Sequence, residues 1–169
     1  ADPAELDASV GRLNDASLRY RLGEHREDDF AAADVVIVNP AVPPDNRFVR
    51  IAQKHGALIT SQIELFFQMC PAPIVGITGS NGKSTTTTLT AHLLGTGRRR
   101  VWLGGNIGHE PLLTIAGQIA ADDVVVLEIS NFQLEQLARI QAAPQIALIT
   151  NLTPNHLDRH GTMEAYTAA

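Results

Sequence analysis

Hydrophobic and polar positions along the chain alternate between short apolar runs and longer amphipathic stretches. The most apolar runs lie within residues 34–40, 73–78 and 123–130, and each is bounded by polar or turn-forming residues. Runs of this length that are rich in β-branched residues are typical of strands buried on both faces of a parallel sheet. Amphipathic stretches with helical periodicity separate these runs. The pattern therefore predicts an α/β fold.

The second half of the chain has the clearest succession of elements. We predict strands at 74–78, 101–104, 124–129 and 146–150, and helices at 83–95, 111–120 and 131–140, with another helix starting in the last residues. The first half is less regular: we predict a helix at 4–14, strands at 18–24, 34–40 and 57–60, a short helical piece at 28–33, a helix capped by Asp45 and ended by Gly56, and a helix opened by a Ser61–Glu64 capping box.

The stretch Cys70-Pro71-Ala72-Pro73 interrupts this pattern, because two prolines so close together break regular structure. We place a domain boundary there, with one domain at 1–71 and another at 72–169. The first domain has few strands for a doubly wound fold, and the last residues resemble the start of a helix. We therefore expect the chain to be incomplete at both ends.

Composition narrows the classes of function. The net charge of −5 gives no general attraction to nucleic acid or to an anionic membrane. A single cysteine rules out an internal disulfide and suits a reducing compartment. No apolar run approaches the roughly 20 residues of a membrane span, and the polar start of the chain does not resemble a signal peptide. We therefore expect a cytoplasmic protein without membrane insertion.

A glycine-rich turn, Gly-Ser-Asn-Gly, lies between the strand predicted at 74–78 and the helix predicted at 83–95, and it leads into Lys83 and Ser84. The standard phosphate-loop pattern needs glycine at position 77, where this chain has Ile77. The context is nonetheless that of a phosphate site, because backbone N–H groups and a helix N-terminus face one concavity. A lysine there neutralises phosphate charge, and the adjacent hydroxyl can hold Mg²⁺.

Two further polar groups follow strands of the predicted sheet. Glu128 ends the run VVVLE, at the sheet edge where parallel-sheet sites form, and a carboxylate there can bind Mg²⁺. His156, Asp158 and His160 follow the strand at 146–150 with H-x-D-x-H spacing. The position directly after a strand points to a functional His156, whereas we expect His160 to be structural.

Four segments together resemble a known family. GITGSNGKST, GGNIG, LEISNFQLE and NLTPNHLDRHGTMEAY, in this order, resemble the Mur ligases of peptidoglycan synthesis, whose phosphate loop has the same displaced first glycine. The resemblance covers residues 34–169 well. The last two segments are most similar to the members that add D-glutamate.

The resemblance implies a Rossmann-like N-terminal domain for a UDP moiety and a P-loop ATPase-type parallel sheet with flanking helices, both partial here, with the family's C-terminal domain absent. The implied reaction is the ATP-dependent addition of D-glutamate to UDP-N-acetylmuramoyl-L-alanine through an acyl phosphate, in cell wall biogenesis. The implied enzyme is a monomer that uses ATP and Mg²⁺. We expect this chain alone to be inactive, because the family's carbamylated lysine would fall just after Ala169.

The resemblance also implies roles for individual residues. Lys83 would contact the β- and γ-phosphates, Ser84 and Glu128 would hold one Mg²⁺, and His156 would hold a second. Asn106 and Ser130 would lie near the UDP-linked substrate. The residues expected to surround the ATP phosphates are Gly79, Ser80, Asn81, Gly82, Lys83, Ser84, Thr85 and Thr86.

Asn39 and Ala41 occupy the place where family members often have Ser-Pro-Gly, near the diphosphate. If the backbone at Ala41 needs a positive φ, alanine costs on the order of 1 kcal/mol there.

Three alternatives remain open. The chain could belong to another Mur-type or a folylpolyglutamate-type ligase, to a generic P-loop ATPase or kinase, or to a nucleotide-binding module without catalysis. Glu128 and His156 argue against the last of these.

Overall fold

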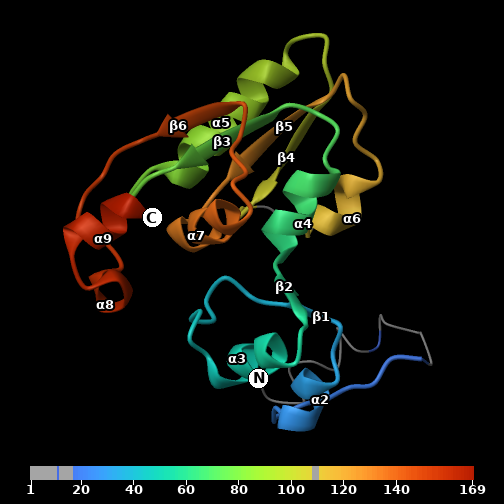
Figure 1. The fold of residues 1–169 in the computed structure, drawn as a ribbon. Coiled ribbons are helices and arrows are strands. Elements are labelled where there is room, and N and C mark those ends of the chain that lie inside the picture. The colour runs from blue at the N-terminus through green and yellow to red at the C-terminus, as the bar shows by residue number, and fades with distance from the viewer. Residues whose placement is uncertain (1–10, 12–16, 108–110) are drawn as a thin grey trace. The chain divides into compact units, whose positions relative to one another are not determined.

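A computed structural model describes residues 11, 17–107 and 111–169 of the chain (Figure 1). The chain divides into two compact units, each described here by itself: Ala1–Val36 with Pro43–Ile59, and Ile37–Val42 with Thr60–Ala169. The domain boundary expected at residues 70–73 stays a prediction. The helix expected at 4–14 lies outside the described residues.

The first unit contains the helices α2 (Glu27–Ala31) and α3 (Arg47–Lys54). They pack through the rings of Phe30 and Phe48, whose centroids lie 5.0 Å apart. Helix α3 is capped by Asn46, whose side chain accepts a hydrogen bond from the Phe48 N–H, so the cap predicted at Asp45 is wrong by one residue. The strands β1 (Val35–Ile37) and β2 (Leu58–Thr60) form a two-stranded sheet. Residues 18–24 form no strand, contrary to the prediction.

The second unit is built on a four-stranded sheet in the order β4-β5-β3-β6. Its strands are β3 (Ile74–Thr78), β4 (Val101–Gly105), β5 (Val124–Glu128) and β6 (Ile146–Ile149). All the pairings are parallel, and Glu128 of β5 lies opposite both Ile77 of β3 and Gly105 of β4. The carboxyl ends of the strands therefore meet at one edge of the sheet.

Helices cover both faces of this sheet (Figure 1). On one face lie α4 (Gln62–Met69), α6 (Leu112–Ala116) and α7 (Asn131–Arg139), which share a core with Val125, Leu127 and Ile129. On the other face lies α5 (Lys83–Gly95), which packs on Ile77 and Val126. Because side chains alternate along a strand, Glu128 points to the same face as Val126, the face that α5 covers.

The remaining helices, α8 (Leu157–His160) and α9 (Met163–Ala168), follow β6. The α/β class with a parallel sheet is thus confirmed. The helix predicted at 111–120 is shorter and ends at Gly117, its C-cap residue. Within the described ranges, no helix is both long enough and apolar enough to cross a membrane.

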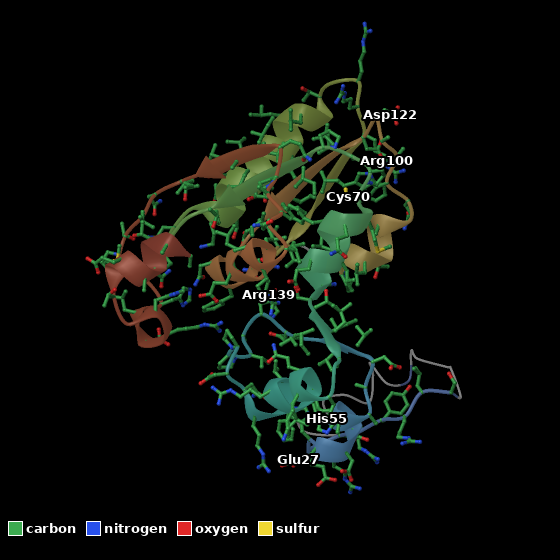
Figure 2. All side chains as sticks on the ribbon, in the orientation of Figure 1. Glu27, His55, Cys70, Arg100, Asp122 and Arg139 are labelled. Atoms are coloured by element: carbon green, nitrogen blue, oxygen red, sulfur yellow. The ribbon has the colours of Figure 1, made fainter. Side chains whose placement is uncertain are left out.

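The amino-terminal edge of the sheet is held by a polar cluster around Asp123. Its Oδ2 accepts hydrogen bonds from Trp102 Nε1 at 2.8 Å and from the Ala120 N–H at 2.9 Å. The guanidinium of Arg100, labelled in Figure 2, lies 3.9 Å from the centre of the Trp102 ring. The Trp102 hydrogen bond, with the Ala120 N–H and the Arg100 charge, lowers the pKa of the Asp123 carboxyl.

We expect Asp123→Asn to make the free energy of unfolding depend less on pH between pH 7 and pH 3. A carboxyl whose pKa is depressed by folding stabilises the protein above its unfolded pKa of about 3.9, and this contribution disappears as the pH falls through the folded pKa. Urea unfolding at pH 7 and pH 3 should therefore show a larger wild-type advantage at pH 7. Asp122→Asn, at the exposed neighbouring residue, is the control; equal effects of the two variants would contradict the assignment.

Candidate active site

The turn Gly79–Gly82, referred to below as the phosphate loop, connects β3 to α5 and is held in place by Asn151. The Ser80 N–H donates to the Asn151 carbonyl at 3.0 Å, and the Asn81 N–H donates to Asn151 Oδ1 at 3.0 Å. Asn151 Nδ2 donates in return to the Asn81 carbonyl at 2.8 Å. Asn151 lies two residues after the last residue of β6, with Thr150 between them. The end of one strand therefore fixes the backbone of the loop that follows its neighbour.

The side chain of Ser80 is buried and hydrogen-bonds to residues outside the loop. Its Oγ accepts from the Thr153 N–H at 2.9 Å and donates to the Thr153 carbonyl at 2.8 Å. It also lies 3.0 Å from the hydroxyl of Tyr166 on α9. Only 5% of Ser80 is exposed. The hydroxyl is thus engaged with the protein itself. Because the Ser80 and Asn81 N–H groups are bonded to Asn151, a ligand would meet the start of α5 and the neighbouring side chains.

Helix α5 begins at Lys83, and its first turn faces the loop. The Lys83 ammonium donates to the carbonyls of Gly79 at 2.7 Å and Ser80 at 3.1 Å. Gly82 is the N-cap with φ of 80° and offers no side-chain cap, and the first N–H groups of a helix have no intrahelical partner. These donors and the helix dipole favour an anion.

The side of α5 next to the loop is accessible. Ser84 and Thr85 are exposed, whereas Thr86 is half-buried. A hollow of about 560 Å³ runs along the helix and is lined by Ser84, Thr85, Thr88, Leu89 and His92. A ligand bound at the loop would therefore meet the two hydroxyls without any movement of the helix.

A Gly79→Ala substitution should distort the phosphate loop. Gly79 has φ of +133°, and a Cβ there would lie 2.2 Å from Thr150 Oγ1 and 2.9 Å from the Asn151 carbonyl oxygen. In the ATP-binding role that the sequence resemblance implies, ATP affinity measured by calorimetry should fall by about tenfold or more, because donors displaced by an ångström lose most of their interaction. Gly117→Ala, where an added Cβ meets nothing within 4 Å, is the control. Unchanged ATP affinity in the Gly79 variant would contradict this prediction.

Glu128 is buried at the same sheet edge and has one carboxylate oxygen without a partner. Asn106 Nδ2 donates to Glu128 Oε1 at 3.1 Å, and the Asn106 N–H donates to the Glu128 carbonyl at 2.8 Å. Only 2% of Glu128 is exposed, and its Oε2 has no hydrogen-bond partner. A buried, unpartnered carboxylate oxygen is costly, and a divalent cation is a ligand that would satisfy it. The side chain therefore fits a Mg²⁺ ligand.

His156 lies in a strained backbone conformation after β6. Its φ is +50°, which is rare for a residue other than glycine, and its N–H donates to Asn155 Oδ1 at 2.9 Å. Its exposed ring lies 5.1 Å from the ring of Phe132 on α7. Strain of this kind often marks a functional site.

Among the described residues, His, Cys, Asp and Glu side chains alone do not complete a metal site at Glu128 or His156. In the described part of the chain, no group of three or more His, Cys, Asp and Glu side chains is arranged to hold a metal ion. A cation at this edge would therefore need oxygen ligands from a substrate or water in addition to the protein.

Ser130 and Asn131, at the start of α7, are both engaged within the protein. Ser130 forms a reciprocal capping box with Gln133, so its hydroxyl is used in starting the helix. Asn131 Nδ2 lies 2.6 Å from Nε2 of His160, whose side chain is only 4% exposed. The buried position of His160 agrees with the structural role expected for it.

The turn at residues 39–42 closes on itself. Asn39 Oδ1 accepts from the Ala41 N–H at 3.0 Å, and the Asn39 carbonyl accepts from the Val42 N–H at 3.0 Å. Among the described residues other than glycine, positive φ occurs only at Gln141 and His156. Ala41 thus avoids the left-handed conformation, and the cost considered for alanine at this position does not arise.

Sequence reasoning missed the residues that support the site. Asn151, Thr153 and Tyr166 hold the phosphate loop, and Phe132 contacts the ring of His156. Asn151 had one visible signal, since it is a polar residue directly after a predicted strand. The aromatic contacts depend on how α7 and α8 approach each other and leave no comparable pattern.

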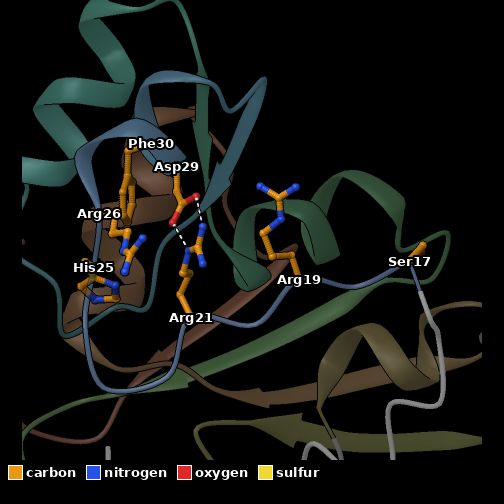
Figure 3. A pocket seen from close by; sticks show the side chains of 7 residues that line it. All are labelled: Ser17, Arg19, Arg21, His25, Arg26, Asp29 and Phe30. Carbon is orange, nitrogen blue, oxygen red and sulfur yellow. Dashed lines mark hydrogen bonds and ion pairs between the residues drawn. The ribbon is translucent and has the colours of Figure 1, made fainter.

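A separate hollow of about 510 Å³ lies in the first unit (Figure 3). Its lining is rich in cationic groups: Ser17, Arg19, Arg21, His25, Arg26, Asp29 and Phe30. Arg21 donates two hydrogen bonds to Asp29, which lowers the pKa of that carboxyl, and Arg26 pairs with Glu24. Because two of the arginines are already paired with carboxylates, we do not include this hollow in the candidate site.

Comparison with known proteins connects this geometry to one family. Residues 77–169 match the Mur ligase middle domain. The chain is 46% identical over 167 residues to a UDP-N-acetylmuramoylalanine–D-glutamate ligase from Roseiflexus sp., covering 99% of this chain and 36% of the relative. It is 44% identical to the enzyme of the same name from Koribacter versatilis, covering 98% of this chain and 36% of that relative. The chain thus spans about a third of the length of these relatives.

Two solved structures share the fold. A UDP-N-acetylmuramoyl-L-alanyl-D-glutamate–2,6-diaminopimelate ligase superposes with a TM-score of 0.51 at 26% identity, over 72% of this chain and 33% of that one. A MurF ligase from Thermotoga maritima, solved in complex with ADP, superposes with a TM-score of 0.50 at 22% identity, over 83% of this chain and 42% of that one.

Proposed function

The chain belongs to the Mur ligase family, and on that premise we propose that it supplies the nucleotide site of an ATP-dependent ligase. The proposed reaction joins D-glutamate to UDP-N-acetylmuramoyl-L-alanine, a step of peptidoglycan precursor synthesis. One observation carries the proposal. The phosphate loop, whose carbonyls bind the Lys83 ammonium, lies at the same sheet edge as Glu128, and the buried Oε2 of Glu128 lacks a partner.

The choice of amino acid rests on the relatives rather than on the loop. The relatives with 44–46% identity along almost the whole chain are named as D-glutamate ligases. The phosphate loop by itself is common to ligases that use other amino acids. D-Glutamate is therefore the substrate that the comparisons favour.

In the proposed reaction, two anions must meet: the γ-phosphate of ATP and the carboxylate of the UDP-linked substrate. The carboxylate oxygen attacks the γ-phosphorus, the bond to ADP breaks, and an acyl phosphate forms. The amine of D-glutamate then attacks the acyl carbon, and inorganic phosphate leaves with formation of the amide. Positioning and charge neutralisation dominate such a transfer.

The residues of this chain have distinct tasks in that reaction. The Lys83 ammonium would leave the Gly79 and Ser80 carbonyls and contact the β- and γ-phosphates. The unpaired N–H groups at the start of α5 would bind phosphate oxygens. Asn106, held by Glu128, and the turn containing Asn39 and Ala41 would contact the UDP-linked substrate.

Ser84 and Glu128 would hold one Mg²⁺, and His156 would contribute to a second. Bound Mg²⁺ would neutralise charge on the phosphates and on the attacking carboxylate. The carboxylate of Glu128 would keep its hydrogen bond from Asn106 through Oε1 and present Oε2 to the cation. The protein thus orients one oxygen of Glu128 and leaves the other available.

The proposal is tested by product analysis with a ligase of full family length that carries this chain. The enzyme would be incubated with ATP, Mg²⁺, UDP-N-acetylmuramoyl-L-alanine and, in separate reactions, L-alanine, D-glutamate or a diamino acid. We expect phosphate release and a new amide, identified by mass spectrometry, with D-glutamate only.

Other outcomes would refute specific parts of the proposal. Product formation with a different amino acid, or with a glutamate-tailed folate as acceptor, would assign another ligase of this type. ATP hydrolysis without any amide would support a generic P-loop ATPase. Nucleotide binding that is independent of Mg²⁺, with no turnover, would support a non-catalytic binding module.

A further inference from the structure

Arg159, on α8, contacts residues of the site's framework that lie outside its own short helix. Its Nη1 donates to the carbonyls of Pro40 and Ala41, both at 3.3 Å, and its Nη2 donates to Glu135 Oε2 at 3.1 Å. The guanidinium carbon lies 4.2 Å from the centre of the Phe132 ring. The side chain is 22% exposed.

These partners lie in two segments of the second unit that are separate from α8. Pro40 and Ala41 belong to the turn at 39–42, while Phe132 and Glu135 lie on α7. Arg159 itself lies three residues after His156. One planar cation therefore ties the turn at 39–42 to the loop that carries His156, with α7 as the common support.

The chemistry of this position requires an arginine. A guanidinium can donate to two carbonyls and a carboxylate at once while its flat face rests on an aromatic ring. A lysine ammonium is a point charge without that planar fork, so it would keep the charge but lose part of the contact set. The Phe132 ring also contacts His156, so the surface on which Arg159 rests is the one that flanks the strained histidine.

We propose that Arg159 is a positioning residue that holds the turn at 39–42 in a fixed place relative to the His156 loop. The inference rests on the proposed function, in which that turn contacts the UDP-linked substrate and His156 contributes to a Mg²⁺ site. In this proposal Arg159 does not contact the reactants directly. It acts through the carbonyls of Pro40 and Ala41, which it holds in place.

The test compares Arg159→Met, which keeps length and stacking but removes the donors, with Arg159→Lys. We expect Arg159→Met to raise KM for the UDP-linked substrate by about tenfold or more, because loss of preorganisation weakens binding, with KM for ATP changed by less than about twofold. Arg159→Lys should recover part of that loss. Arg99→Met, in the exposed turn after α5, is the matched control.

Hydrogen exchange supplies a readout that is independent of activity. In Arg159→Met, the Ala41 and Val42 N–H groups should exchange faster, while those of Ser80 and Asn81 in the phosphate loop should not. An unchanged KM for the UDP-linked substrate together with unchanged exchange at 41–42 would overturn the inference. An equal rise in KM for ATP and for the UDP-linked substrate would also overturn it, since that result indicates a general effect on folding. Failure of the proposed function appears differently, as absence of the amide product in the wild-type enzyme.

Discussion

Lys83→Ala is expected to lower ATP-dependent amide formation by about 10³-fold or more, the range seen when a cation that neutralises a transferring phosphoryl group is removed. The Lys83 ammonium contacts the phosphate loop directly, through its hydrogen bonds to the Gly79 and Ser80 carbonyls. Its removal leaves the γ-phosphate and the substrate carboxylate to repel each other. The measurement is phosphate release under saturating ATP and UDP-linked substrate.

The chain offers a matched control for this change. Its only other lysine is Lys54, which is exposed near the end of α3 in the other unit. Lys54→Ala removes the same charge and should leave turnover within about twofold, because a solvent-exposed charge outside the phosphate loop is screened by salt. Near-normal turnover in Lys83→Ala would refute the proposed site. A loss of similar size in both variants would show that net charge, rather than position, is responsible.

Glu128→Gln is expected to raise the Mg²⁺ concentration for half-maximal activity by at least about tenfold, because glutamine keeps the shape of the side chain but lacks its negative charge. The amide oxygen can still accept from Asn106, so the hydrogen bond that orients the side chain can persist. Burial of a neutral amide costs less than burial of a carboxylate, so the fold should not be weakened. Activity is measured across a Mg²⁺ titration at fixed ATP.

Asp122→Asn is the control for the Glu128 change, since Asp122 is an exposed acidic residue just before the other end of β5 (Figure 2). It should leave the Mg²⁺ requirement unchanged. A Mg²⁺ titration of Glu128→Gln that overlays the wild-type curve would remove Glu128 from the metal site. Thermal unfolding of each variant shows whether any loss reflects the fold instead.

Much of the second unit could be predicted from the sequence because its signals are local. The strand Ile74–Thr78 and the helix Lys83–Gly95 coincide with their predicted ranges, since an apolar β-branched run and a glycine turn mark them clearly. Residues 18–24 alternate like a strand yet form none, because a strand also needs a partner to complete its ladder. Alternation alone does not provide that partner.

The site was less predictable because it depends on register. Position alone suggested Glu128, but its hydrogen bond from Asn106 follows from the pairing of Gly105 with Glu128. Likewise, Ser80 matched a phosphate-binding pattern, whereas its hydroxyl is engaged with Thr153 and Tyr166. Contacts between residues 22 to 86 positions apart carry this information, and local patterns do not contain it.

The hydrogen bonds between Asn151 and the phosphate loop have a kinetic and thermodynamic consequence. Because the Ser80 and Asn81 amides are already tied to the end of β6, the conformational entropy of the loop is lost when the protein folds. A nucleotide then meets a rigid receptor and loses little further entropy on docking. Association should therefore be a single fast step, without a slow isomerisation of the loop after encounter.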